Sequence, residues 1–555
     1  MRDEQETIVA ALSQPGAYPH RPARVVHLQT HISHVFVAPP YAYKLKRAIR
    51  LPFLDFSDRA SRERFCREEL LVNRRICPAL YLGIDLVTRS AEGEISVAGS
   101  GETLDFLVRM RSLPAEGMLP AALEAGRITK EHLEDFARRL ADFHAEAPTS
   151  PEVIAANAPE CIAERWGDLL KSTAPMVGDT MPSVDQEILA DFGTTFIGRH
   201  ETLLRARQSS GHVRECHGDL HGGNLCLVEP GLTELEDAPP VEAGLHAFDC
   251  LEFSQQLRSV DVASEVAFLA MDLEWRGHPQ LARAFVASYL ERSRDRDLPL
   301  LLPYYSAYRA LVRGMVDGLF SRNPDNSAEA RAGAAERARL RFRLAVQCAW
   351  RAAGPLLIAC RGLSGSGKTT IGLAVADRIG ALLLSSDEIR KRSAGLDPRR
   401  PAPADALDAL YSDAARRSTY EALAAAIETA LDAGRLVIAD ATFTQRAERE
   451  RIAKIAKRRE CPFVILDCEA PPEIVRERLE RRAQRASAGA EPALSDAGWD
   501  VYLAQAATAE ALVADEPRIR VESAGDLSSI VERVLRDLWS WRRRHPVHRS
   551  AVSIR

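Results

Sequence analysis

The chain has 555 residues, of which 46% are hydrophobic and 27% charged, with a formal net charge of −5. This length exceeds what one hydrophobic core supports, so two or more domains are expected. The composition is that of an ordinary globular protein and excludes a fibrous or low-complexity chain. The mild net charge gives no indication of a polyanionic partner.

The ends of the chain and its cysteines bear on where the protein works. No apolar run approaches the roughly 18 residues that span a bilayer, so no membrane association is expected. The first residues, MRDEQETIVAAL, include acidic side chains and lack an apolar signal core, which argues against export. The ten cysteines form no CxxC pair or regular framework, a pattern typical of reduced thiols. We therefore expect a cytoplasmic protein.

The first part of the chain predicts strands followed by a helix. The apolar runs RVVHLQT and HVFVAPPYAYKLKR, within residues 24–50, predict β-strands around a tight turn at Pro39-Pro40. The segment SDRASRERFCREELLVNRRI then predicts a helix with Ser57 as its N-cap and an end imposed by Pro78. From about residue 130 to 345 the pattern is mostly helical, interrupted by one loop and by the strand-like GLHAFDCLEF.

The last third of the chain has a different pattern. An Ala/Arg-rich helix leads to Gly354-Pro355, where we place a boundary between domains 1–345 and 355–555. Beyond it, the strand-like segments PLLIAC, ALLLSS, LVIAD, FVILDC and RIRVES alternate with helical segments. Strands that alternate with helices predict an α/β fold with a parallel, doubly wound sheet.

A glycine-rich segment, RGLSGSGKTT, follows the first of these strands and precedes the helical TIGLAVADRI. Glycines let backbone N–H groups surround a phosphate, and the N-terminus of the next helix adds positive potential. A lysine here reaches the β- and γ-phosphates of ATP, and a threonine hydroxyl binds Mg²⁺. A glycine-rich turn with a chance lysine is the alternative, but the flanking strand and helix favour a P-loop. The predicted nucleotide-binding residues are Gly362, Gly365, Gly367, Lys368, Thr369 and Thr370, with Thr369 also a Mg²⁺ ligand.

Polar residues at the ends of the next two strands indicate what this P-loop could do. Asp387 and Arg390, in SSDEIRKR, would lie on the first turn of a helix at the sheet edge where such folds bind ligands. The carboxylate can accept a proton from a substrate hydroxyl, and the arginine can hold substrate or phosphate. An N-cap with a nearby cation is the simpler interpretation of this pair. Asp440, at the end of LVIAD, favours the catalytic interpretation of Asp387 and Arg390, because a Mg²⁺-associated carboxylate commonly lies at the end of this strand.

These features resemble the zeta-toxin and polynucleotide-kinase-like P-loop kinases over about residues 355–540. The resemblance implies that Asp387 is the general base and that Arg390 contacts the substrate. The helical PPEIVRERLERRAQR would form a lid over ATP. Four arginines are candidates for the lid residue that contacts ATP: Arg478, Arg481, Arg482 and Arg485. We choose Arg482.

The segment ECHGDLHGGNLCL could bind either zinc or phosphate. The His-x₃-His spacing of His217 and His221 suits zinc only on a helix, and the glycines argue against a continuous helix. Phosphoryl transfer needs a carboxylate at the acceptor hydroxyl and Mg²⁺ ligands from an asparagine and a second aspartate. Asp219 supplies the first, while Asn224 and Asp249, which a β-hairpin could connect, supply the others. We therefore predict phosphate chemistry.

The same segment resembles the catalytic loop of the aminoglycoside-phosphotransferase family, over roughly residues 25–320. The resemblance implies an α+β, protein-kinase-like domain of two lobes with Asp219 as the base. YAYKLKR would carry the phosphate-binding lysine, Lys44 or, on the same face, Lys46, and Glu69 would be its ion-pair partner. LDFLVRMRSLP resembles the hinge strand that contacts adenine. The whole arrangement is similar to the fused bifunctional aminoglycoside phosphotransferase/ATP-binding proteins, although no antibiotic-binding acidic cluster can be assigned.

The combined expectation is a protein with two phosphotransferase sites, each using ATP and Mg²⁺ to phosphorylate a hydroxyl of a small molecule. One alternative is a nucleotide sensor in which one domain regulates the other. Another is a nucleic-acid 5′-hydroxyl kinase built on the second domain alone. From residue 351 onward 33 Lys+Arg face 29 Asp+Glu, so 33 − 29 gives only +4, which argues against nucleic acid. The acceptors and the oligomeric state stay open.

Overall fold

The fold is described by a computed structural model over residues 2–546, apart from 52–53, 231–234, 236–237, 399, 401, 404–405, 411 and 488–496. The chain divides into two compact units, which are 1–169 with 194–310, and 170–193 with 311–555. These units differ in extent from the predicted domains 1–345 and 355–555, whose limits stay a prediction. Among the described residues, no helix is both long enough and apolar enough to cross a bilayer.

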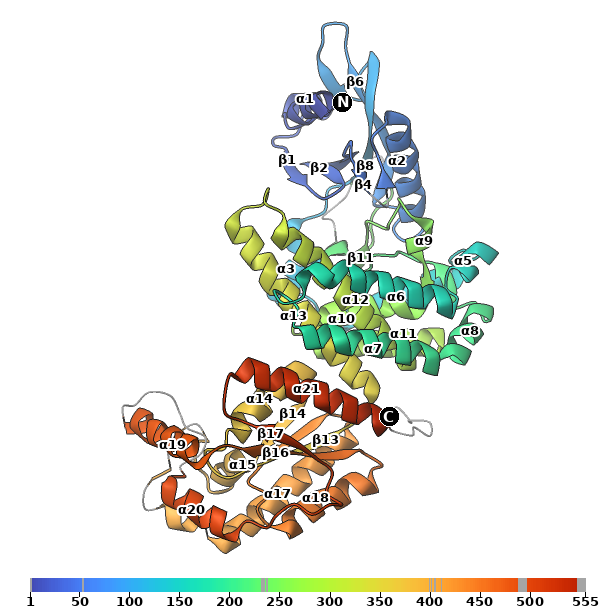
Figure 1. Ribbon diagram of the computed structural model, residues 1–555. Helices are drawn as coiled ribbons and strands as arrows, with labels where there is room; N and C mark the ends of the chain where they lie inside the picture. The colour runs from blue at the N-terminus through green and yellow to red at the C-terminus, as the bar shows by residue number, and fades with distance from the viewer. Residues whose placement is uncertain are drawn as a thin grey trace. The chain divides into compact units, whose positions relative to one another are not determined.

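The first unit contains a six-stranded antiparallel sheet in the order β1-β2-β3-β8-β6-β7, whose strands are drawn in shades of blue in Figure 1. The predicted Pro-Pro turn is confirmed, since Pro39 and Pro40 connect β2 to β3 in an antiparallel pair. The strands are β1 (Val26–Gln29), β2 (Ser33–Ala38), β3 (Tyr41–Lys46), β6 (Tyr81–Arg89), β7 (Ile95–Val97) and β8 (Glu102–Arg111). Two short strands, β4 (Arg50–Leu51) and β5 (Leu54–Asp55), pair separately.

The side chains of β3 point alternately to the two faces of this sheet. Tyr43 and Leu45 point into a core that includes α1 (Arg2–Leu12) and the 3₁₀ turn η1 (Pro15–Ala17). Ala42 points to the opposite face, where it packs in a second apolar cluster with α2 (Arg59–Arg74). Lys44 and Lys46 share this second face, and it therefore carries buried charge beside an apolar cluster.

Helix α2 begins one residue later than the sequence indicates. The predicted N-cap, Ser57, is wrong, because the carboxylate of Asp58 accepts the backbone N–H of Ser61 at 2.8 Å. The Ser57 hydroxyl instead donates to Asp55. A carboxylate next to a serine competes for the same orphan N–H groups, and here the carboxylate wins. The helix ends before Pro78, as predicted.

The rest of the first unit is mostly helical, as predicted. Its loop-bearing part consists of the 3₁₀ turn η4 (Gly222–Asn224) followed by an antiparallel hairpin of β10 (Leu225–Val228) and β11 (Gly244–Ala247). A smaller pair joins β9 (Val213–Glu215) to β12 (Ser259–Asp261). The surrounding helices and turns are η2 (Ala115–Gly117), α3 (Leu119–Glu124), α4 (Lys130–Glu146), α5 (Pro151–Ala155), α6 (Pro159–Thr173), α8 (Glu201–Ser209), α9 (Gln255–Arg258), α10 (Val262–Trp275) and α11 (Pro279–Ser293).

Several helical elements contribute to the second unit ahead of its sheet, including the last residues of α6. The others are parts of α7 (Ser183–Arg199) and α12 (Leu298–Arg322), and all of α13 (Ala328–Ala353). The 3₁₀ turn η3 (Ala174–Met176) also belongs to this unit.

A five-stranded parallel sheet in the order β14-β15-β13-β16-β17 forms the centre of the second unit. The prediction of a parallel α/β sheet is confirmed, and all five predicted strands are present: β13 (Leu357–Arg361), β14 (Leu382–Ser385), β15 (Val437–Asp440), β16 (Phe463–Glu469) and β17 (Arg518–Glu522). The accompanying helices are α14 (Lys368–Ile379), α15 (Ser386–Ser393), α16 (Leu407–Leu410), α17 (Asp413–Asp432), α18 (Arg446–Arg458), α19 (Pro472–Ser487), α20 (Trp499–Thr508) and α21 (Leu527–Arg544).

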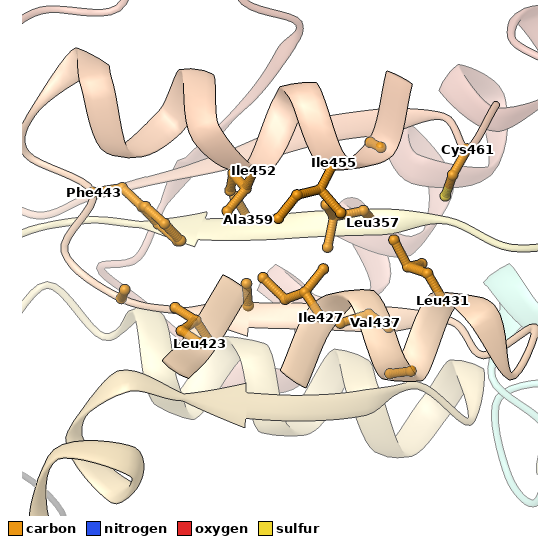
Figure 2. Close-up of a cluster of buried hydrophobic side chains, with 14 of the residues drawn as sticks. Leu357, Ala359, Leu423, Ile427, Leu431, Val437, Phe443, Ile452, Ile455 and Cys461 are labelled. Atoms are coloured by element: carbon orange, nitrogen blue, oxygen red, sulfur yellow. The ribbon is translucent and has the colours of Figure 1, made fainter. Parts of the chain in front are cut away.

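Helices cover both faces of this sheet. Leu423 and Ile427 of α17, with Ile452 of α18, pack against Leu357 and Ala359 of the central strand β13 (Figure 2). Helix α14 covers the other face, where Gly372 lies against side chains of β13, β14 and β15. Burial on both faces explains why these strands read as continuous apolar runs.

Candidate functional site

The glycine-rich loop connects β13 to α14 at the carboxyl edge of the parallel sheet. Gly365 and Gly367 have φ angles of +80° and +86°, which residues other than glycine rarely adopt. A Cβ on Gly365 would lie 2.8 Å from the side chain of Val475 in α19. The loop therefore needs glycine at these positions, and Lys368 and Thr369 open α14 directly after it.

Asp440 faces the loop from the end of the neighbouring strand β15. One of its oxygens, Oδ2, accepts the Thr369 hydroxyl at 2.8 Å. The residue is 3% exposed, and within the described residues its Oδ1 has no hydrogen-bond partner. Burial raises the pKa of Asp440, and Asp387 adds to this effect while Lys368 and Thr369 oppose it. The structure thus brings the predicted metal pair, Thr369 and Asp440, together.

Asp387 and Arg390 both lie on α15, which follows β14, and their side chains form an ion pair. Ser385 caps this helix, accepting the backbone N–H of Glu388. The simple N-cap interpretation of Asp387 is therefore wrong, because the capping position belongs to Ser385. The roles of Asp387 as base and of Arg390 as substrate contact stay predictions.

Among the lid arginines with described side chains, Arg478 is the one with contacts to the loop. Its guanidinium donates to the Gly365 carbonyl at 3.4 Å and to Ser523. Burial lowers the pKa of Arg478, with Arg481 adding to the effect. Arg482, the predicted lid residue, is half-buried. The side chain of Arg485 lies outside the described part.

The loop between β9 and β10 places Asp219 beside Asn224. The amide of Asn224 donates to Asp219 twice, at 3.0 Å to the backbone carbonyl and at 3.1 Å to Oδ2. His221 Nε2 lies 3.4 Å from the same carboxylate oxygen. His217 contacts the Phe248 carbonyl at 2.9 Å, so it ties this loop to the segment that carries Asp249.

Lys44 connects β3 to two carboxylates that are distant in sequence. Its Nζ lies 2.9 Å from Glu69 of α2 and also forms an ion pair with Asp249. Burial alone lowers the pKa of Lys44, but Asp249 and Glu69 raise it well above its usual value. Asp249 itself adopts a positive φ of 66° at the end of β11, and its side chain is 40% exposed. The predicted residues Lys44, Glu69 and Asp249 are therefore in contact.

The sequence leaves open whether Lys44 or Lys46 is the phosphate-binding lysine, and in the structure both contact the predicted partner Glu69. Lys46 Nζ contacts the second oxygen of Glu69 and also a buried glutamate, Glu252, which the sequence analysis missed. Its position three residues after Asp249 is the one signal that could have indicated it. The pairing spans 206 residues, so no local pattern reveals it.

The zinc alternative finds no support in the geometry around His217 and His221. Nδ1 of His221 accepts the backbone N–H of Gly223 at 3.0 Å. The one group of metal-capable side chains found among the described residues includes Cys216 of this loop, with His144 of α4 and Glu265 of α10, but neither His217 nor His221. Glu265 already accepts two loop N–H groups, at 2.8 and 2.6 Å, and contacts His144. These hydrogen bonds explain the cluster as an anchor of the loop.

Comparison with known proteins places a family in the second unit. Residues 357–512 match the family model AAA_33, described as an AAA domain. With the glycine-rich loop and the parallel sheet, this match shows that the C-terminal part carries a P-loop domain. The matched residues lie in the second unit, and the resemblance of the first unit to aminoglycoside phosphotransferases stays a prediction.

Relatives that extend over most of the chain are uncharacterized proteins. One is from Mycobacterium tuberculosis (Rv2004c) and one from Mycobacterium bovis (Mb2027c), each 28% identical over 488 residues, which is 85% of this chain and 90% of the relative. Solved structures that match a third of the chain include a sugar kinase from Janibacter (26% identity, TM-score 0.26) and a gluconokinase from Sinorhizobium meliloti (20%, 0.25). Each is matched over 34% of this chain and 94% of its own length.

Proposed function

We propose that this protein is a bifunctional ATP- and Mg²⁺-dependent phosphotransferase, with one site in each unit and a small-molecule hydroxyl as each acceptor. The observation that carries the proposal is the contact between Thr369 and Asp440 beside the glycine-rich loop. A hydroxyl and a buried carboxylate at this place serve no evident packing role. They match what a Mg²⁺·ATP complex requires of a P-loop.

The donor set at this loop fits Mg²⁺. Magnesium prefers oxygen ligands and keeps several waters, so it needs one or two protein oxygens beside the phosphates. Thr369 Oγ1 and Asp440 supply such oxygens, and Oδ1 of Asp440, which has no hydrogen-bond partner in the described part of the chain, is a buried acceptor that a cation would satisfy. Bound there, Mg²⁺ would neutralise charge on the β- and γ-phosphates.

The residues around the loop support transfer to a hydroxyl. Lys368 would reach the phosphates from the start of α14, and Arg478, which contacts the loop, would serve as the lid residue in place of the predicted Arg482. Asp387 lies on α15, which begins at the same sheet edge, and would take the acceptor proton. Its ion pair with Arg390 would fix the position of the carboxylate.

A second observation favours a phosphotransferase site in the first unit. Lys44 bridges Glu69 and Asp249, while Asn224 holds Asp219 in the adjoining loop. Protein-kinase-like enzymes need these parts: a lysine at the phosphates, two Mg²⁺ ligands and a carboxylate base. Lys44 would bind phosphate, Asn224 and Asp249 would hold Mg²⁺, and Asp219 would accept the hydroxyl proton.

The test uses the full chain and two variants, Lys368→Ala and Asp219→Asn, separately and together. ATP consumption is measured with hydroxyl-bearing metabolites and with 5′-hydroxyl oligonucleotides as acceptors. Asp219→Asn keeps the shape and removes the proton acceptor, so turnover at the first site should fall by ~10²–10⁴-fold with ATP affinity retained. Lys368→Ala should abolish turnover at the P-loop site alone.

Each contrary outcome points to a stated alternative. Unchanged turnover in Asp219→Asn would remove this residue from the mechanism and favour the nucleotide-sensor alternative. Activity that depends on Lys368 and appears with oligonucleotides alone would favour the nucleic-acid kinase. Wild-type turnover of Lys368→Ala at the second site would overturn the P-loop assignment.

A further inference from the structure

Lys46 and Glu252 form a buried ion pair next to the first candidate site. Lys46 is fully buried, Glu252 is 3% exposed, and Lys46 Nζ contacts both Glu252 and the oxygen of Glu69 that Lys44 does not contact. Glu69 therefore lies between two lysines, one at each carboxylate oxygen. The two lysines are two residues apart on one face of β3, which is why both can reach α2.

Glu252 belongs to the segment that carries Asp249. This segment is held at each step by another element: the Asp249 N–H donates to Tyr81 of β6 at 2.9 Å, and the Cys250 N–H to Asn73 of α2 at 2.9 Å. The pair of Glu252 with Lys46 adds a connection to β3. The segment is thus attached to the elements that also position Lys44 and Glu69.

Stability alone is a poor explanation for such a pair. Burying two charges carries a large desolvation cost, and replacing a buried ion pair with neutral side chains is often without effect on stability. A charge in the right place can instead orient neighbouring groups of a metal site. Glu69 illustrates the effect: burial alone raises its pKa, but Lys44 and Lys46 together lower the pKa to about 2.

We propose that Lys46 and Glu252 are positioning residues for Mg²⁺·ATP at the first site, an inference that rests on the proposed function of that site. Lys44 contacts Asp249 and Glu69 at once, so a bound phosphate would be the third anion in contact with its ammonium group. Lys46 compensates Glu69 independently and leaves Lys44 available to phosphate. Glu252, held by Lys46, fixes the segment whose Asp249 would hold Mg²⁺.

The test compares two neutralised ion pairs in full-length protein carrying Lys368→Ala, which silences the P-loop site. The first variant is Lys46→Met with Glu252→Gln. The matched control is Arg207→Met with Asp295→Asn, a buried pair 2.7 Å apart in the same unit, to which no role in ATP binding is assigned. Calorimetry measures affinity for Mg²⁺·ATP and, in EDTA, for ATP alone, and urea unfolding measures stability.

The Lys46/Glu252 variant should lose about 10–100-fold in affinity for Mg²⁺·ATP, as is usual for groups that orient metal ligands, and lose less for ATP in EDTA. The control should keep its Mg²⁺·ATP affinity even where its stability falls. Equal affinity losses in both variants, or none in the first, would overturn the inference. If the first variant does not fold, Glu252→Gln alone undergoes the same comparison. Failure of the Lys368→Ala parent to bind Mg²⁺·ATP would instead refute the proposed function of the site.

Discussion

At the scale of single residues, the pairing of Thr369 with Asp440 gives the most direct prediction. Asp440→Asn keeps the size of the side chain and a possible contact with Thr369, but it removes the negative charge. We expect ATP binding in EDTA to persist, while Mg²⁺-dependent turnover at the P-loop site falls by at least roughly 10–100-fold. A titration of turnover against Mg²⁺ checks this, and an unchanged Mg²⁺ requirement would contradict it.

Asp185 in α7 gives a prediction about pH. Burial raises the pKa of its carboxyl to about 6, although the ion pair with Arg378 of α14 opposes the shift. Because the folded state holds the proton more tightly than the unfolded state, this group stabilises the fold most at low pH. That contribution is lost as pH rises from about 4 to about 6 and amounts to roughly 3 kcal/mol at most.

The comparison that isolates this group uses Asp185→Asn, which cannot titrate. The melting temperature of the wild type minus that of the variant should increase as the pH falls from 7 to 5. Calorimetric scans across that range measure the difference, and the neighbouring Arg343 and Glu532 are present in both proteins. A difference that is constant or that shrinks toward pH 5 would show that Asp185 stays charged in the fold.

At the scale of elements, α13 is an integral part of the second unit. Trp350 is fully buried, and its ring packs edge-on against Trp539 of α21 with centroids 4.9 Å apart. Two turns earlier, Arg343 forms two hydrogen bonds with Asp377 at the end of α14. A fragment that starts at residue 355 would lose these contacts and expose Trp539.

We therefore expect Trp350→Ala to lower the free energy of unfolding of the second unit by about 3–5 kcal/mol, the usual cost of emptying a buried tryptophan site. Arg339→Ala, on the exposed face of the same helix, serves as the control and should change the free energy of unfolding by less than about 0.5 kcal/mol. Urea unfolding measures both. A small effect of Trp350→Ala would mean that the cavity collapses without cost.

The strands and the P-loop of the second unit could be predicted from the sequence, whereas the packing of its helices could not. The strands from β13 to β17 were predictable because each is a short apolar run bounded by turns, and strand type depends on local pattern. The P-loop was predictable for the same reason, as its residues are contiguous. The packing of Trp350 on Trp539, and of α7 on α14 through Asp185, joins segments nearly 200 residues apart that share no local signal.

The candidate sites divide in the same way. Asp219 with Asn224, and Asp387 with Arg390, are close in sequence, and the structure places each pair in contact. Lys44 with Glu69 was predicted only through the order of motifs along the chain. Glu252 was missed because a lone glutamate near a strand end is commonplace, and only the fold brings it to Lys46. Residues that act through other residues are thus the hardest to predict.

At the scale of the whole molecule, two candidate nucleotide sites on one chain make a countable prediction. Calorimetry with Mg²⁺·ATP should find two bound nucleotides per wild-type chain. Lys368→Ala removes the main cation of the P-loop and Lys44→Met that of the first site, so each variant should bind one nucleotide. The double variant should bind none.

The affinities from the same titrations separate two independent enzymes from a sensor. If one site regulates the other, losing one nucleotide must change the affinity at the other, and by the same factor in both directions, because linkage is reciprocal. Independent catalytic sites predict that the remaining affinity in each single variant equals that of the same site in the wild type. Equal shifts of about fivefold or more in both variants would therefore favour regulation between the two sites. Unchanged affinities, with one nucleotide lost in each variant, are the outcome that two separate phosphotransferase sites require.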